Sequence, residues 1–113
     1  METFLSEESE LLFHEKKWIG EFHFLAGIDE AGRGCCAGPV CAASVMFTDF
    51  RKIPGDVMDS KQLTHENRMK IREYLLHEPS VIYGIAMVHE NEIDQINILR
   101  ATWKAMRLAV QNM

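Results

Sequence analysis

The chain has 113 residues and a formal net charge of −5 at pH 7, with 47% hydrophobic and 26% charged residues. This length and composition are typical of one soluble domain with a modest core, and they exclude an intrinsically disordered chain. No apolar run approaches the ~20 residues that a membrane span needs, so the sequence also excludes a membrane-spanning protein.

The acidic excess is concentrated in the first 21 residues, which hold six acidic residues and two lysines. Residues 22–113 hold eleven acidic and ten basic residues and are nearly balanced. Apolar residues recur among the acids of 4–18 at a spacing that suits an amphipathic helix. We therefore predict an acidic helical appendage over 1–21 and a folded body over 22–113, in which contact with nucleic acid depends on locally placed bases.

The cellular compartment is indicated by the same terminus and by the cysteines. The acidic terminus lacks the basic and then apolar pattern of an export signal. Cys35, Cys36 and Cys41 fall close together, at no spacing that suits a zinc site. We expect them to be small buried side chains of a reducing, cytoplasmic protein.

The body is predicted to contain both strands and helices. Short apolar runs predict strands, and apolar residues repeating every three or four positions predict helices. Thr64 suits the N-cap of a helix, and Gly84 indicates a bend or a close packing contact within a strand. We assign strands to 22–29, 39–47 and 81–88, a loop to 49–58, and helices to 64–77 and 90–113.

The last of these helices carries an apolar stripe that we predict to be core. Asn97 and Thr102 lie on the same helix, and we expect them to tie it to the sheet by hydrogen bonds rather than to contact a ligand. The predicted stripe consists of Ile93, Ile96, Leu99, Trp103, Met106 and Val110.

The most informative stretch is Gly27-Ile28-Asp29-Glu30-Ala31-Gly32-Arg33-Gly34. Asp29 and Glu30 stand where the first predicted strand opens to solvent, and hard divalent cations take such oxygen ligands. Gly32 and Gly34 permit backbone angles and close approaches that a side chain blocks. Arg33 offers a planar set of donors suited to phosphate. A cation site beside an anion site indicates a phosphodiester substrate.

Two other interpretations of this stretch were weighed. An acidic pair beside a glycine turn is often only a solvated strand end. The stretch also approaches a P-loop pattern, but Arg33 and Gly34 stand where Lys and Ser or Thr are required, and the two acids would repel phosphates. The P-loop interpretation is therefore rejected.

Four blocks of the sequence, taken together, resemble the prokaryotic ribonuclease HII family in order and spacing. They are the stretch 27–34, then Ala37-Gly38-Pro39-Val40, then Asp59-Ser60-Lys61-Gln62-Leu63, and finally 92–106, which contains Glu92-Ile93-Asp94, Asn97-Ile98, Ala101-Thr102 and Ala105-Met106. The resemblance implies an α/β fold, a ribonuclease H-like mixed sheet flanked by helices. It also implies that this chain is an N-terminal fragment, truncated before the later strands. Cys35 and Cys36 depart from the family, which usually has Pro and Leu there.

The resemblance implies an endoribonuclease that hydrolyses the RNA strand of RNA/DNA hybrids and cuts 5′ of ribonucleotides embedded in duplex DNA. The family uses two-metal-ion catalysis with Mg²⁺ or Mn²⁺, held by four carboxylates. Asp29 and Glu30 match the first two, as catalytic and metal-binding residues. The other two follow the last block in family members, so we expect the isolated chain to be inactive.

The resemblance also implies substrate-binding residues. Gly32, Arg33 and Gly34 would contact the ribose 2′-hydroxyl and the adjacent phosphate, and Ser60 and Lys61 would hold a backbone phosphate. Without the neighbouring match, Lys61 would be an ordinary surface lysine at a loop end.

Two alternatives to an enzyme remain open: a non-catalytic nucleic-acid-binding fragment and an interaction fragment. The intact parent is expected to be monomeric. A fragment that lacks its later strands leaves a sheet edge uncovered, and such edges favour association. We therefore expect the isolated fragment to be marginally stable or to self-associate.

Overall fold

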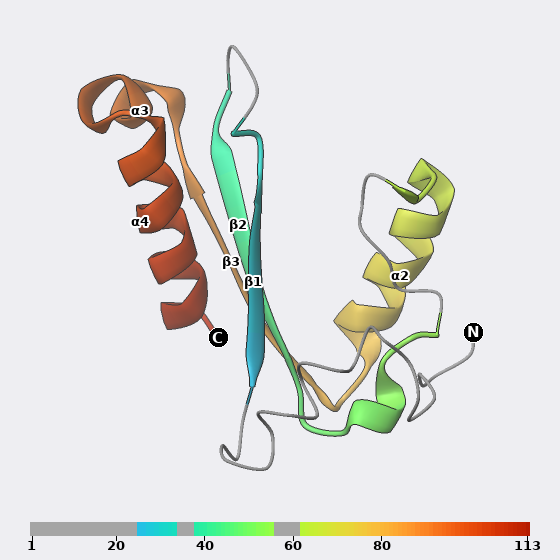
Figure 1. Ribbon diagram of the computed structural model, residues 1–113. Helices are drawn as coiled ribbons and strands as arrows, with labels where there is room; N and C mark the ends of the chain where they lie inside the picture. Colours follow the sequence, from blue (N-terminus) through green and yellow to red (C-terminus); the bar gives the residue numbers. More distant parts are fainter. Residues whose placement is uncertain (1–24, 34–37, 56–61) are drawn as a thin grey trace. The chain divides into compact units, whose positions relative to one another are not determined.

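The computed structural model describes residues 25–33, 38–55 and 62–113 (Figure 1). Its elements, in order, are β1 (Ala26–Ala31), β2 (Val40–Phe47), the 3-10 turn η2 (Phe50–Lys52), α2 (His65–His77), β3 (Val81–Val88), α3 (Glu90–Ile96) and α4 (Ile98–Gln111). The α/β class predicted from the sequence is confirmed. Among the described helices, none is long and apolar enough to cross a membrane. The predicted appendage over 1–21 lies outside the described residues.

The chain divides into two compact units. One, called the sheet unit below, consists of Ala26–Met46 and Ile82–Met113, and the other, called the α2 unit, includes Phe47–Val81. Each unit has its own set of stabilising contacts.

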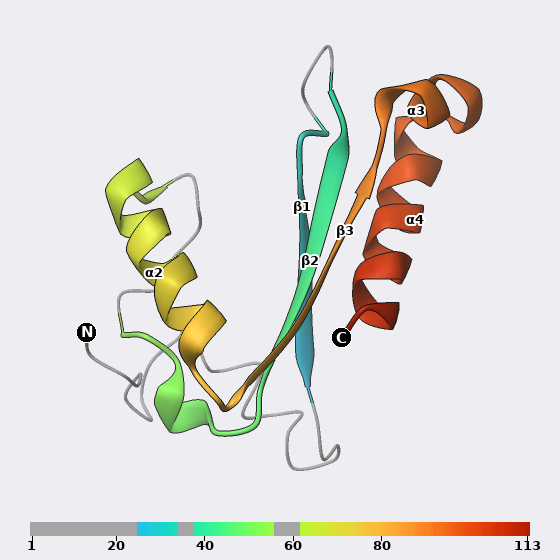
Figure 2. The same ribbon diagram turned by 180° about the vertical axis from the view of Figure 1, so that it is seen from behind.

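The strands form one sheet in the order β1-β2-β3. β1 and β2 are antiparallel, with Ala26 opposite Met46 and Ala31 opposite Cys41. β3 runs back along β2 (Figures 1 and 2). The resemblance implies a mixed sheet, and the described strands contribute antiparallel pairs to it. β1 is therefore an edge strand in this part of the chain.

β2 and β3 occupy the predicted ranges closely, whereas β1 is shifted. β1 begins at Ala26 and continues to Ala31, two residues beyond the predicted end at Asp29. The strand ends at Gly32, whose φ is +89°. A Cβ atom at this position would lie 2.5 Å from the carbonyl oxygen of Pro39. The turn after β1 therefore requires glycine both for its backbone angle and for its close approach to the start of β2.

The hydrophobic core lies between the sheet and α4, which run side by side in both views (Figures 1 and 2). Small side chains let the two approach closely, and Gly84 has no space for a side chain, since a Cβ there would lie 2.0 Å from the carbonyl oxygen of Ala109. The close packing contact predicted at Gly84 is thus confirmed. The buried hydrophobic residues are Val40, Ala42, Ala86, Val88, Ala101, Ala105 and Ala109.

The single helix predicted over 90–113 is wrong, because the segment forms two helices that meet at Asn97. Asn97 has a φ of +71°, which ends α3, and its side chain accepts a hydrogen bond from the backbone nitrogen of Arg100 at the start of α4. Asparagine tolerates this backbone region better than most residues. Lys104 of α4 pairs with Glu92 of α3, which holds the two helices together.

The apolar stripe predicted for this segment is only partly core. Ile93, Ile96 and Met106 pack against the core, but Leu99, Trp103 and Val110 are 41%, 60% and 45% exposed. The buried face of α4 consists instead of Ala101, Thr102, Ala105 and Ala109. Small residues face the sheet because the helix lies too close to it for large ones.

The expected helix-to-sheet hydrogen bonds exist but come from other residues than Asn97 and Thr102. Thr102 donates to the carbonyl oxygen of Ile98 in its own helix. The buried hydroxyl of Ser44 donates to the carbonyl oxygen of Ala109 at 3.0 Å, and the Asn112 side-chain amide donates to the carbonyl oxygen of Ile85 at 2.9 Å. These two bonds fasten the last turn of α4 to β2 and β3.

The α2 unit is organised by caps and polar contacts. Thr64 caps α2 as predicted, its hydroxyl accepting from the backbone nitrogen of Asn67. No residue of α2 is buried. The Tyr74 hydroxyl donates to the carbonyl oxygen of Lys52 at 2.6 Å. Burial raises the pKa of Tyr74, and the nearby carboxylate of Glu78 raises it further.

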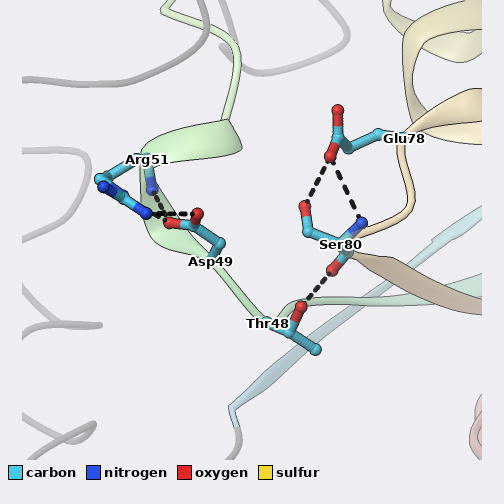
Figure 3. Close-up of polar contacts among 5 residues, drawn as sticks. All are labelled: Thr48, Asp49, Arg51, Glu78 and Ser80. Atoms are coloured by element: carbon cyan, nitrogen blue, oxygen red, sulfur yellow. Dashed lines mark hydrogen bonds and ion pairs between the residues drawn. The ribbon is translucent and has the colours of Figure 1, made fainter.

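Figure 3 shows the polar contacts of residues that follow the end of β2 and precede the start of β3. Both the backbone nitrogen and the hydroxyl of Thr48 donate to the carbonyl oxygen of Ser80. Glu78 accepts from the backbone nitrogen and the hydroxyl of Ser80. Asp49 accepts from the backbone and the guanidinium of Arg51. These hydrogen bonds lower the pKa of Asp49 below its usual range.

Candidate nuclease site

The two candidate metal-binding carboxylates occupy consecutive positions of β1, Asp29 opposite Ala43 and Glu30 opposite Ala42. Successive side chains of a strand point to opposite faces of the sheet, so Asp29 and Glu30 lie on different faces. Asp29 is exposed and Glu30 is half-buried. The Asp29 carboxylate accepts a hydrogen bond from the backbone nitrogen of Glu30 at 2.9 Å.

The candidate substrate-binding residues are only partly described. Gly32 follows the last residue of β1 and lies against the carbonyl oxygen of Pro39. The next residue, Arg33, is exposed. Gly34, Ser60 and Lys61 lie outside the described residues. Asp29, Glu30, Gly32 and Arg33 are neighbours along one described stretch of the chain, and the roles assigned to them and to Gly34, Ser60 and Lys61 stay predictions.

The donor set was tested for its fit to divalent cations. Exposed carboxylate oxygens are the ligands that Mg²⁺ and Mn²⁺ prefer, so Asp29 and Glu30 fit in kind. Two carboxylates are too few ligands for a pair of ions, and the described residues contain no group of three or more His, Cys, Asp or Glu able to hold a metal ion. A site for two ions at this position needs carboxylates from another part of a polypeptide.

Two residues near the site have structural roles that the sequence analysis did not assign. Gly38 has a φ of +103°, and the carbonyl oxygen of Pro39 faces Gly32. Both belong to the block Ala37-Gly38-Pro39-Val40, which we used only as a pattern. The Gly-Pro pair was the available signal, because glycine and proline together are typical of a tight turn. Cys41, next in the chain, is a half-buried free thiol.

Comparison with known proteins identifies the family. The family model described as Ribonuclease HII matches residues 26–113. The chain belongs to the ribonuclease HII family. The match begins at Ala26, the first residue of β1, and it includes all of the described elements.

Curated relatives agree with this assignment. Ribonuclease HII of Chlamydia caviae is 43% identical over 100% of this chain and 55% of the relative. Ribonuclease HII of Caldicellulosiruptor bescii is 46% identical over 96% of this chain and 52% of the relative. Ribonuclease HII of Caldanaerobacter subterraneus is 45% identical over 97% of this chain and 45% of the relative. The chain therefore spans about half the length of the curated relatives it matches.

Proposed function

We propose that this ribonuclease HII chain contributes the first two metal-binding carboxylates and the substrate-binding turn of an endonuclease. The enzyme would hydrolyse the RNA strand of RNA/DNA hybrids and cut 5′ of single ribonucleotides in duplex DNA, with Mg²⁺ or Mn²⁺. One observation supports this most strongly. Within the matched family region, two carboxylates stand on an exposed edge strand directly before a tight glycine turn and an exposed arginine.

Asp29 and Glu30 would hold the divalent ions. β1 is an edge strand of the described sheet. Its side chains alternate between the two faces of the sheet, above and below the unpaired edge of the strand. In a site completed by carboxylates from another part of a polypeptide, both residues would serve as oxygen ligands. When bound, a pair of ions activates the attacking water and neutralises charge on the leaving oxygen.

Gly32 and Arg33 would position the substrate. Gly32 allows the tight turn after β1, and a ribose 2′-hydroxyl is a suitable partner for backbone groups of such a turn. The exposed guanidinium of Arg33 would bind the adjacent phosphate in a charge-assisted contact. Recognition of the 2′-hydroxyl is what would separate an RNA strand from a DNA strand at this position.

We expect the isolated chain not to cleave RNA, because Asp29 and Glu30 match only two of the four carboxylates that the family resemblance implies, and the described residues contain no group of three or more metal ligands. The same observation favours a second candidate function, a non-catalytic fragment that binds hybrid duplex through Arg33. The two functions differ in their dependence on metal. Binding of hybrid by the fragment alone would be independent of Mg²⁺, whereas cleavage requires it.

Binding of a fluorescent RNA/DNA hybrid to the full chain tests the assignment of Arg33. Arg33→Ala should weaken binding about tenfold, because one charge-assisted phosphate contact is lost. Arg107→Ala, which removes an exposed arginine from α4, serves as the matched control and should leave the affinity within about twofold. Equal effects of the two substitutions, or no binding by the unaltered chain, would contradict the role given to Arg33.

A further inference from the structure

Within the α2 unit, the turn η2 and the helix α2 are joined by a hydrogen bond between residues far apart in the sequence. The Tyr74 hydroxyl donates to the carbonyl oxygen of Lys52 at 2.6 Å, and the two residues are 22 positions apart. Figures 1 and 2 show the green turn η2 close to the C-terminal end of α2. Tyr74 therefore fixes the backbone at the point where the chain leaves η2.

The chain that leaves η2 returns to the other end of the same helix. The Arg68 guanidinium donates to the carbonyl oxygen of Leu63 at 2.9 Å, and the hydroxyl of the next residue, Thr64, caps α2. The start of α2 and Tyr74 are about 15 Å apart along the helix, since each helical residue rises ~1.5 Å. The segment 53–62 is therefore held by α2 at both of its ends.

This segment contains the second pair of residues that we assigned to the substrate. Ser60 and Lys61 would hold a backbone phosphate, and both lie outside the described residues. A lysine presents a point charge on a flexible stem, so its contact with a phosphate depends on where its backbone is held. A segment with fixed ends also has fewer conformations to lose when it binds. Holding both ends thus favours the phosphate contact.

We propose that Tyr74 is a positioning residue for the phosphate contact of Lys61. Its hydroxyl holds the first end of segment 53–62, while Arg68 and Thr64 hold the second end. The inference rests on the proposed function and deepens it, because it adds a residue of α2 that acts on the substrate through Lys61 without touching it. Tyr74→Phe removes the donor hydroxyl and keeps the ring.

The alternative is that Tyr74 only stabilises the α2 unit. A loss of stability lowers the fraction of folded chain, which reduces the apparent affinity by the same factor at each salt concentration. The loss of a phosphate contact changes the salt dependence itself, because each such contact releases counterions from the nucleic acid. The slope of log affinity against log salt concentration therefore separates the two roles.

Binding of a fluorescent RNA/DNA hybrid to the full chain, measured over a series of salt concentrations, tests the proposal. Lys61→Ala should weaken binding and reduce the slope by about one. Tyr74→Phe should weaken binding about threefold, as expected for one hydrogen bond, and should reduce the slope by part of the same amount. In the Lys61→Ala background, Tyr74→Phe should have no further effect on either quantity.

The matched control is Tyr83→Phe, which removes the same hydroxyl from a tyrosine of β3 that is 41% exposed. It should leave the affinity and the slope unchanged. Circular dichroism checks that each variant folds.

The outcomes separate positioning from the proposed function. An unchanged slope in Tyr74→Phe, or an effect that adds to that of Lys61→Ala, would overturn the inference and leave the phosphate contact of Lys61 intact. Unaltered affinity and slope in Lys61→Ala would contradict both the phosphate contact and the role given to Tyr74.

Trypsin cleavage after Lys61 tests the inference without nucleic acid. If Tyr74 holds the segment, Tyr74→Phe should increase the rate of cleavage at this bond by about threefold or more, because local opening becomes easier. Tyr83→Phe should be cleaved like the unaltered chain. Equal rates in the two variants would overturn the inference even if the unaltered chain does not bind the hybrid, a result that would itself contradict only the proposed function.

Discussion

The sheet unit and the α2 unit are stabilised by different kinds of contact. In the part of the chain that the structure describes, the hydrophobic core cluster belongs to the sheet unit, and the helix that covers it contributes small side chains and backbone. Among the described residues, the α2 unit has a helix with no buried residue, a helix cap and a set of exposed hydrogen bonds. We infer that the sheet unit unfolds cooperatively, whereas α2 opens locally at a lower free energy.

The largest expected loss of stability is at Gly84, where the sheet unit has no space for a side chain. Gly84→Ala would place a Cβ atom 2.0 Å from the Ala109 carbonyl oxygen and 2.8 Å from the Met113 nitrogen. Because both atoms are backbone, relief requires α4 to move, and we expect a loss of about 3 kcal/mol or more in urea denaturation. Gly27→Ala is the control: nothing lies within 4 Å of its Cβ, so its effect should stay within about 1 kcal/mol. Equal losses would refute the close packing of α4.

The next effect concerns the hydrogen bond from Ser44 to Ala109. Ser44→Ala leaves a buried carbonyl oxygen without this donor, so the free energy of unfolding should fall by about 1–2 kcal/mol. Thr48→Ala removes an exposed hydroxyl whose acceptor, the Ser80 carbonyl oxygen, keeps the backbone bond from Thr48. That control should lose less than about 0.5 kcal/mol. A larger loss of unfolding free energy from Thr48→Ala than from Ser44→Ala would contradict the idea that buried contacts stabilise the sheet unit more than exposed ones stabilise the α2 unit.

In the α2 unit, Thr64→Ala should cost about 1 kcal/mol and act locally. The substitution removes the acceptor for the backbone nitrogen of Asn67. Hydrogen exchange should therefore quicken for amides of α2 and stay unchanged in β2 and β3. Thr64→Ser, which keeps the hydroxyl, should behave like the original chain. A uniform increase in exchange across the sheet would show that the two units unfold together.

The smallest effect is expected at Asp49, and it depends on pH. Hydrogen bonds from Arg51 lower the pKa of Asp49 below its usual value of 3.8. The pair therefore stabilises the folded chain above this pH, and its contribution is lost as the pH falls through the lowered pKa. Asp49→Asn should reduce stability slightly at neutral pH and not at all in strong acid. In an Arg51→Gln background the pH-dependent effect of the same substitution should shrink but not vanish, because the backbone nitrogen of residue 51 still donates to Asp49; an undiminished effect would exclude the Arg51 side chain as the main cause.

Much of the fold followed from sequence pattern because the relevant signals are local. The bounds of β2 and β3 and the Thr64 cap depend on residue types within a few positions. At Gly84 the glycine itself was the signal, although the atoms that crowd it belong to the distant end of α4. The break at Asn97 was missed because apolar spacing continues through it, and spacing does not reveal a positive φ. The inward face of α4 was misjudged because large apolar residues were taken for core, whereas the distance between helix and sheet selects alanine.

The candidate site, like the fold, could be predicted from the sequence only where the signal is local. Asp29, Glu30, Gly32 and Arg33 are contiguous, so one motif was enough to place them together. Their alternation across the two faces of β1 follows from strand geometry but was not considered before the strand bounds were known. Under the proposed function, the remaining carboxylates of the metal site would come from distant parts of a polypeptide, and no local pattern in the described residues supplies them.

The central claim is that Asp29 and Glu30 are metal-binding residues of a nuclease, and a chimera tests it most directly. In the chimera, this chain replaces the matched half of Chlamydia caviae ribonuclease HII, so that no separate association step is needed. We predict Mg²⁺-dependent cleavage of the RNA strand of an RNA/DNA hybrid, with a fall of ~100-fold or more in kcat for Asp29→Asn and for Glu30→Gln. Glu66→Gln, at an exposed carboxylate of α2, should cleave like the unaltered chimera. Undiminished cleavage by the Asp29 and Glu30 variants would contradict the claim.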